Sequence, residues 1–303
     1  MTGKTIEPNG QSGDGTAERE SLRSSFWQQG RAGDCPIIDM HGHMGAWSGI
    51  YFPKAEPDQM VRIMDRSGVR LLVFSHHDAL SLPDIGNEAS ATAVRRHPDR
   101  LRAYCVINPH EPGLAAADMA RFDARRDIYV GLKLHATMHG VSYLDDRYKT
   151  AFSFADDLRL PVLLHTWDDP RCNAEVVRSL ARQYRHATLI MGHSCYPHWE
   201  GAAELAREFD HVYLELCAVL QEQNGALDWF AGRAGSEKIL YGTDFPWFSH
   251  HYYIGGVLAA DISDDDRRNI FYRNARRILA GSGLPPQAMN KQAAREDQPD
   301  REL

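Results

Sequence analysis

Long apolar runs, paired cysteines and excess basic charge are all missing from this sequence. Its 303 residues contain no stretch of the roughly 18 apolar residues that a membrane-spanning helix needs, and the first residues lack the apolar core of a secretory signal. The five cysteines are widely spaced and form no CxxC pair, which is typical of reduced thiols rather than of a disulfide framework. These absences predict a cytoplasmic protein without a membrane partner.

Basic residues are in the minority. The 34 Lys and Arg residues face 41 Asp and Glu, for a formal net charge of −7, so the chain lacks the positive charge with which proteins bind nucleic acid. Neither a GxGxxG fingerprint nor a P-loop is present. The expected partner is a small-molecule substrate, and the sequence leaves open whether the chain forms a homodimer.

Both ends of the chain are poor in large apolar residues. Residues 1–34 hold five of them, and residues 285–303 begin with two prolines and continue almost entirely polar. Neither segment buries enough apolar surface to offset the entropy lost on ordering, so we predict disordered tails at 1–34 and 285–303. The roughly 250 residues between them, 35–284, match the size of one α/β barrel.

Within 35–284, eight short apolar runs alternate with longer amphipathic stretches. Most runs are continuously apolar, as is typical of parallel strands buried on both faces. Repeated strand–helix units predict an α/β fold, a single (β/α)8 barrel of TIM type, with a doubly wound open sheet as the alternative. The predicted strands are residues 36–41, 70–75, 101–107, 129–134, 161–165, 187–193, 212–216 and 238–244.

Histidine, by contrast, is abundant, and seven of the 15 histidines follow or end a predicted strand. The C-terminal ends of barrel strands meet at the barrel mouth, where such enzymes carry their active sites. His41 and His43 are two residues apart, so strand alternation puts both side chains on one face. The other five are His76, His77, His135, His165 and His193, and Asp244 ends the eighth strand.

This set has the chemistry of a metal site. Imidazoles from the first, fifth and sixth strands would converge with the carboxylate of Asp244, and such nitrogen and oxygen ligands fit Zn²⁺, Mn²⁺ or Fe²⁺. The ion would lower the pKa of a bound water toward 7 and polarise a substrate carbonyl. One strand-end histidine alone is more often a hydrogen-bonded core residue, so the prediction depends on the ordered set.

The sequence resembles the amidohydrolase superfamily in five motifs, IIDMHGH, GLKLH, VLLHTW, LIMGHS and LYGTDFP, spread over residues 36–246. The resemblance is to its amidohydrolase-related branch, which includes aminocarboxymuconate-semialdehyde decarboxylase. It implies catalytic roles for His193, which would steer the metal-bound water, and for Asp244. It also implies one metal ion rather than two, zinc first with manganese or iron as alternatives, bound by His41, His43, His165 and Asp244.

Lys133, in GLKLH, is open to two interpretations. Superfamily members with two metals use a carboxylated lysine of the fourth strand as a bridge, and His165 and His193 would then hold the second ion. Alternatively, Lys133 is unmodified and binds a substrate carboxylate or a barrel carboxylate. Strand alternation gives Lys133 and His135 the same facing, so either could reach the mouth.

Further residues after the strands are candidates for substrate binding. Aromatic side chains there favour a planar or apolar substrate body, or they only pack loops onto the barrel. The aromatic candidates are Trp47, Trp167 and Trp247, and the polar candidates are His76, His77, Asn108 and His135. No arginine falls at a strand end, although Arg171 in the loop after the fifth strand could swing in.

Three functions fit this pattern. The first is a metal-dependent hydrolase in which activated water attacks an amide, lactone or ester-like bond. The alternative is a metal-dependent non-oxidative decarboxylase, a lyase of the same branch, which usually needs a basic group to hold the substrate carboxylate. A non-catalytic binding barrel is the remote alternative, disfavoured by the complete ligand set. Ligands alone do not separate the first two, because fold and metal site are shared across these reactions.

Overall fold

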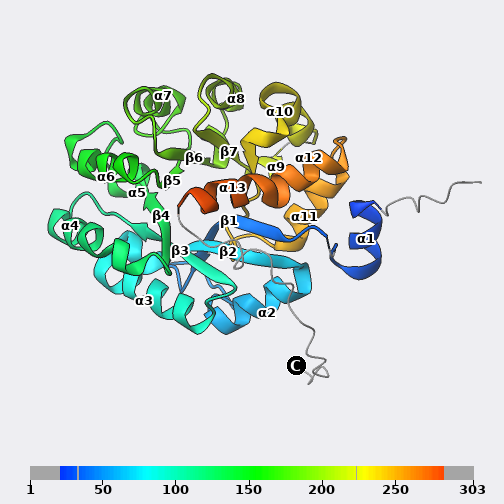
Figure 1. Ribbon diagram of the computed structural model, residues 1–303, viewed down its shortest axis with the longest axis horizontal. Coiled ribbons are helices and arrows are strands. Elements are labelled where there is room, and N and C mark those ends of the chain that lie inside the picture. The colour runs from blue at the N-terminus through cyan, green and yellow to red at the C-terminus, as the bar shows by residue number, and fades with distance from the viewer. Residues whose placement is uncertain (1–20, 33, 223, 283–303) are drawn as a thin grey trace, which may run out of the picture.

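The computed structural model describes residues 21–32, 34–222 and 224–282, and within them eight parallel strands form one sheet. The strands pair in chain order from β1 to β8, and helices surround them (Figure 1). This is the (β/α)8 barrel of TIM type that the alternation predicts. The strands are β1 (Ile37–Met44), β2 (Val69–His76), β3 (Leu101–Val106), β4 (Tyr129–Leu134), β5 (Pro161–His165), β6 (Thr188–Gly192), β7 (Val212–Glu215) and β8 (Ile239–Leu240).

Helices of several lengths connect these strands. The α-helices are α1 (Leu22–Gln29), α2 (Pro57–Ser67), α3 (Pro83–Arg96), α4 (Pro112–Arg121), α5 (Ala136–His139), α6 (Asp146–Asp157), α7 (Ala174–Gln183), α8 (Trp199–Glu208), α9 (Val219–Glu222), α10 (Ala226–Ala234), α11 (His250–Ala259), α12 (Asp264–Arg268) and α13 (Asn274–Gly281). The short 3-10 turns are η1 (His77–Leu80), η2 (Asp123–Arg125), η3 (His193–Cys195) and η4 (Ser236–Lys238), and η5 (Asn269–Arg273) is a π-helix.

The eighth strand is shorter than the predicted 238–244. β8 ends at Leu240 because the chain then crosses to β1, where the backbone N–H groups of Thr243 and Asp244 both donate to the carbonyl of His41, at 3.3 and 2.8 Å. The N–H of His43 donates in turn to the carbonyl of Phe245 at 2.7 Å. These bonds join the last strand to the first and place Asp244 beside the paired histidines.

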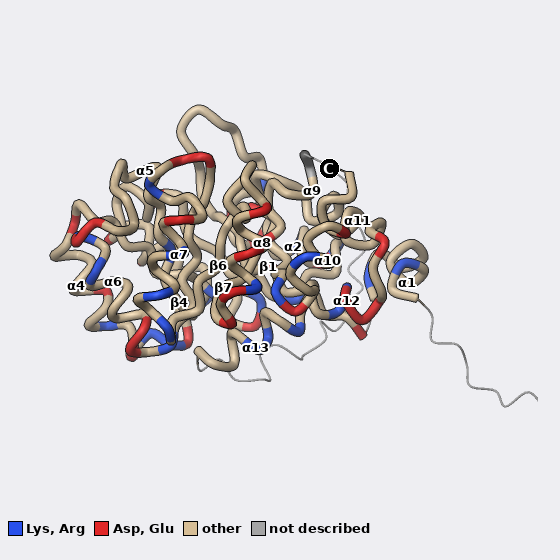
Figure 2. Tube along the Cα trace, turned by 90° about the horizontal axis from the view of Figure 1, so that it is seen from above, with Lys and Arg blue, Asp and Glu red and all other residues tan. Residues whose placement is uncertain are grey.

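One apolar cluster fills the barrel interior and fixes which end is the mouth. Ile38 and Met40 of β1 lie in it together with Ile278 and Leu279 of α13, so α13 covers one end of the barrel. Figure 2 shows α13 at the lower edge and α5 and α9, which follow β4 and β7, near the upper edge. The catalytic face is therefore the end opposite α13.

A bulge in β1 turns its histidines toward the interior. Asp39 pairs with Leu72 and Gly42 with Phe74, so three steps on β1 match two on β2. An extra residue of this kind changes which alternate side chains face inward. Gly42 then faces Leu72, where an added Cβ would lie 2.6 Å from Cδ1. Glycine at this position allows the flanking histidines to point into the barrel.

The predicted N-terminal tail contains an ordered helix. Leu22 and Phe26 of α1 are buried, and the Phe26 ring stacks on Phe271 with centroids 6.0 Å apart. The backbone N–H of Leu22 donates to Asp264 Oδ2 at 2.9 Å, which fastens the helix start to α12. The expectation of disorder over 1–34 is therefore wrong for residues 22–29, because a few apolar side chains find a partner surface on the barrel.

The remaining expectations about the ends concern other parts of the chain. Residues 1–20 and the predicted tail at 285–303 lie outside the described residues. In the part of the chain that the structure describes, every helix is too short or too polar to cross a bilayer.

Candidate metal centre

His41, His43 and Asp244 form the centre of the site, and we call them the metal-ligand group. Asp244 Oδ1 lies 3.1 Å from His41 Nε2 and 2.9 Å from His43 Nε2. The two rings come from the bulged end of β1, and Asp244 comes from the crossing after β8. Two imidazole nitrogens and a carboxylate oxygen that converge on one point are the donor set of a divalent transition metal.

The protonation states of the group fit a cation. Burial, reinforced by Lys133, holds the pKa of His41 well below its usual value, so the ring is neutral and carries one N–H. His41 Nδ1 lies 2.9 Å from Glu215 Oε2, which uses that N–H. The lone pair of His41 Nε2 then faces Asp244 Oδ1, a buried atom without a hydrogen bond among the described residues. A cation bound between them would be held by both atoms.

Asp244 remains ionised in this setting. Burial alone would raise its pKa, but the imidazoles of His41 and His43 outweigh burial and hold the pKa well below its usual value. The backbone of Asp244 has a φ of 60°, in the left-handed region that non-glycine residues seldom adopt. The backbone bonds of Thr243 and Asp244 to the His41 carbonyl hold this conformation, so the tertiary structure orients the carboxylate.

Lys133 of β4 is the cation that the structure places at the group. Its side chain is fully buried, and Nζ lies 3.1 Å from His41 Nε2. Burial lowers the pKa of Lys133 to about 8, although the carboxylates of Asp244 and Glu215 oppose the shift. The ammonium is thus mostly protonated at pH 7. Of the two residues that strand alternation left open, Lys133 is the one against the metal-ligand group.

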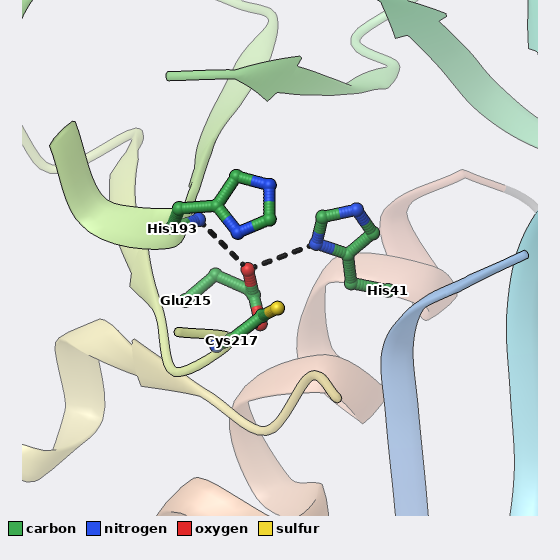
Figure 3. A group of neighbouring side chains, drawn as sticks. All are labelled: His41, His193, Glu215 and Cys217. Carbon is green, nitrogen blue, oxygen red and sulfur yellow. Dashed lines mark hydrogen bonds and ion pairs between the residues drawn. The ribbon is translucent and has the colours of Figure 1, made fainter. Parts of the chain in front are cut away.

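Glu215, at the end of β7, contacts the metal-ligand group through His41 Nδ1, the ring nitrogen that does not face Asp244. Figure 3 shows its carboxylate between His41 and the backbone of His193, with Cys217 beside it. Oε2 accepts the N–H of His193 at 3.0 Å as well as the bond from His41, and Oε1 accepts the N–H of Cys217 at 2.6 Å. Burial raises the pKa of Glu215 to about 8, against the lowering effect of these N–H donors. The sequence analysis missed this residue.

A signal for Glu215 does exist in the sequence. It is the single charged residue in VYLEL, at the C-terminal end of an apolar strand, the position searched for histidines and for Asp244. Burying a carboxylate there costs free energy unless it is hydrogen-bonded, so its position indicates a candidate site residue in the same way.

His165 and His193 form a second pair of imidazoles. His193 Nε2 lies 3.2 Å from His165 Nδ1, and burial lowers the pKa of His193 to about 4 and that of His165 well below its usual value. His135 stacks on His165 with centroids 3.8 Å apart, and its Nδ1 accepts the N–H of Met138 at the start of α5. The His193 ring lies 5.1 Å from the His41 ring, so the pair borders the metal-ligand group.

The turn that carries His193 is strained. His193, Ser194 and Cys195 have φ values of 66°, 48° and 55°, three successive non-glycine residues in the left-handed region. Each costs on the order of 1–2 kcal/mol. Ser194 Oγ donates to the Glu215 carbonyl at 2.8 Å, and the Cys195 N–H donates to Thr166 Oγ1 at 2.8 Å. Bonds to β7 and to the end of β5 therefore keep His193 at the mouth.

Four rings on the β1 side form what we call the aromatic wall: Trp47, Phe52, His77 and Trp247. His77 lies parallel to His43 with centroids 4.9 Å apart, and to Phe52 at 5.5 Å. His77 Nδ1 donates to the Gly45 carbonyl at 2.8 Å, and His77 Nε2 accepts from Trp247 Nε1 at 3.0 Å. Because both of its nitrogens are bonded within the protein, His77 supports the wall.

The other predicted substrate contacts lie at the rim with partners of their own. His76 Nδ1 accepts the N–H of Asp78, and Asn108 Oδ1 accepts that of His110. Trp167 stacks over His165, with centroids 6.1 Å apart. Arg171 Nε donates to Asp169 Oδ1 at 2.8 Å, so this arginine is paired within its own loop.

Comparison with known proteins adds two findings. Residues 38–280 match the family model described as amidohydrolase. No curated protein matches the chain.

Several solved structures share the fold. An uncharacterised TIM-barrel protein from Bordetella bronchiseptica has a TM-score of 0.69 and 19% identity, over 82% of this chain and 100% of that one. The 5-carboxyvanillate decarboxylase of Novosphingobium aromaticivorans, complexed with manganese and a nitrobenzoic acid, has a TM-score of 0.68 and 13% identity, over 82% and 97%. A dihydroxybenzoic acid decarboxylase from a Polaromonas species, with bound manganese and 2-nitroresorcinol, has a TM-score of 0.65 and 18% identity, over 81% and 97%. At this identity the likeness establishes the shared fold.

Proposed function

Because this chain belongs to the amidohydrolase family, we propose that it is a metal-dependent, non-oxidative decarboxylase of a small planar carboxylate. Two structures of the same fold are named as decarboxylases of aromatic acids, and both hold manganese. We therefore prefer decarboxylation to the hydrolysis that the sequence favoured. The metal ligands would be His41, His43, His165 and Asp244.

The position of Lys133 carries the proposal. Its Nζ lies at the metal-ligand group, 3.1 Å from His41 Nε2, in a site from which bulk water is largely excluded. A substrate carboxylate would meet this buried cation and the metal together, and charge-assisted hydrogen bonds are the stronger ones. Hydrolysis of a neutral amide or lactone has no use for such a charge.

The chain's residues divide the work as follows. A bound metal would supply Lewis acidity at the substrate's oxygen atoms. Lys133 would hold the carboxylate, and the aromatic wall would pack against the planar body. The bond from the ring carbon to the carboxylate breaks, CO2 leaves, and the electron pair remains on carbon and takes up one proton. Asp244, which is ionised at rest, would first take up a proton from solvent and then pass it to this carbon, with His193 as the other candidate for the transfer.

Hydrolysis remains the second candidate because of Arg171. Decarboxylation needs a basic side chain that holds the substrate carboxylate. Arg171, which the sequence suggested for that role, is paired with Asp169. If Lys133 instead only neutralises the barrel carboxylates, the site is left with activated water, His193 and Asp244.

The metal and the location extend the proposal. We expect one divalent ion per chain and an unmodified Lys133, with zinc and manganese as first choices and iron as the third, since nitrogen and oxygen ligands suit all three. A reducing compartment such as the cytoplasm is consistent with five buried cysteines, all free.

The test compares Lys133→Met with Arg171→Met as the matched control. Enzyme reconstituted with manganese or zinc is incubated with hydroxybenzoates, amides and lactones, while CO2 release and metal content are measured. We expect CO2 from a carboxylate, about 10- to 100-fold lower kcat/KM in Lys133→Met, and near-parental values in Arg171→Met. Hydrolysis products without CO2 would establish the second candidate, and two metals per chain or a carbamate on Lys133 would overturn the single-ion assignment.

A further inference from the structure

We infer that Glu215 is a positioning residue of the metal centre. Its carboxylate determines which ring nitrogen of His41 faces the metal and, with the same oxygen, holds the backbone of His193. The inference rests on the proposed function only in that His41 binds a metal. It does not depend on whether the reaction is decarboxylation or hydrolysis.

The hydrogen bonds around Glu215 determine which atoms donate and which accept. Oε2 accepts the backbone N–H of His193 at 3.0 Å, and Oε1 accepts that of Cys217 at 2.6 Å. Because backbone N–H groups only donate, both oxygens are turned as acceptors. Toward the ionised carboxylate, His41 Nδ1, 2.9 Å from Oε2, is then the N–H donor of that ring. The remaining lone pair is on Nε2, which faces Asp244 Oδ1.

The segment that follows β8 has room for this carboxylate only because residue 242 is a glycine. A Cβ added to Gly242 would lie 2.1 Å from Glu215 Oε1, closer than any real contact. Gly242 precedes Thr243 and Asp244, so the chain that delivers the metal-binding carboxylate also leaves space for Glu215. Strands β1 and β7 and the segment after β8 thus meet at one buried side chain.

The neighbouring side chains do not make a second metal site of this cluster. His41, His193, Glu215 and Cys217 offer donor atoms within 4.8 Å of one another (Figure 3). An ion there would need His41 Nδ1 and the Glu215 oxygens, which already bond to each other and to the backbone. The cluster therefore orients the first site.

Ser194 provides a matched control. Like Glu215 it is fully buried and joins the His193 turn to β7, but its Oγ bonds the backbone N–H and carbonyl of residue 215 and leaves the carboxylate alone. If Glu215 served only to hold the turn, Ser194→Ala and Glu215→Gln would have similar effects. If Glu215 sets the His41 ring, only Glu215→Gln would weaken the metal.

The experiment measures two quantities on metal-free, full-length protein. Nitrogen-15 NMR of the histidine rings reports the His41 tautomer, and competition with a chelator gives the Kd for Zn²⁺ and Mn²⁺. We expect the Nδ1–H tautomer of His41 in the parent protein, a 10- to 100-fold weaker Kd in Glu215→Gln, and a change below threefold in Ser194→Ala. Circular dichroism checks that each variant is folded.

Each contrary result has one meaning. A parent protein with His41 as the Nε2–H tautomer overturns the inference without any variant, so it stays falsifiable even if Glu215→Gln does not fold. Equal Kd values in the parent and in Glu215→Gln, or equal losses in both variants, also overturn it. A parent protein that binds neither metal would instead remove the premise taken from the proposed function.

Discussion

At the scale of single residues, Asp244 has the largest predicted effect on turnover. Its carboxylate is ionised and faces two imidazoles, so in the proposed reaction it would take up a proton and pass it to the substrate. Asp244→Asn keeps the shape and an oxygen donor but does not titrate. We expect the metal to remain, though less tightly bound, and kcat to fall about 10²-fold or more. Metal content and turnover are measured on one preparation, and activity within a few-fold of the parent would assign the proton to His193.

His165 is the ligand whose place most needs a test. Its Nδ1 faces His193 Nε2 at 3.2 Å, beside the metal-ligand group rather than within it. We predict that His165→Ala loses the metal as completely as His41→Ala, because each variant removes one of the four proposed ligands and leaves the coordination of the ion incomplete. His135→Ala is the control, since that ring stacks on His165 and is not among the residues whose donor atoms converge at the metal-ligand group. Full metal occupancy in His165→Ala by elemental analysis would exclude His165 as a ligand.

At the scale of elements, α1 shows how a short helix is held by few contacts. Phe26 is 8% exposed against the barrel, whereas Trp27, the next residue, is 91% exposed. Phe26→Ala should lower the free energy of unfolding by about 3 kcal/mol, the cost of deleting a buried aromatic ring, and Trp27→Ala by no more than about 0.5 kcal/mol. Urea unfolding of both variants checks this. Equal midpoints would mean that α1 does not pack on the barrel in solution.

At the scale of the whole molecule, the buried histidines should make stability depend on pH. Burial keeps the folded-state pKa of eight histidines below 6.5, with values of about 4 for His193 and about 3 for His77. As pH falls from 6.5 toward these values, the unfolded chain binds protons that the folded chain does not, and stability is lost. The eight are His41, His76, His77, His135, His139, His165, His193 and His211.

The expected slope is steep enough to measure. Each such histidine changes the free energy of unfolding by up to about 1.4 kcal/mol per pH unit. Glu215 has the opposite effect between pH 4.5 and 8, because its folded-state pKa is raised to about 8, but it is a single group. The metal-free protein should therefore lose stability on acidification from pH 6.5 to 4, as thermal melting at each pH would show. A flat profile over this range would mean that the histidines are hydrated.

Part of this protein could be predicted from local pattern. The continuous apolar runs determine parallel strands, and parallel strands of a barrel bring their C-terminal ends together, so His41, His43 and Asp244 could be placed at one mouth before any distance was known. The burial of Phe26 could not be predicted, because its partner, Phe271, is far along the chain.

Only the tertiary structure decided which side chains of the site are hydrogen-bonded to one another. The bond between His41 and Glu215 spans 174 positions, and the one between Lys133 and His41 spans 92. The bulge in β1, the left-handed turn at His193 and the space above Gly242 have the same origin. A tautomer or a buried ion pair depends on distances of a few tenths of an ångström between such strands. Those distances are set when the whole barrel packs, and no local periodicity carries them.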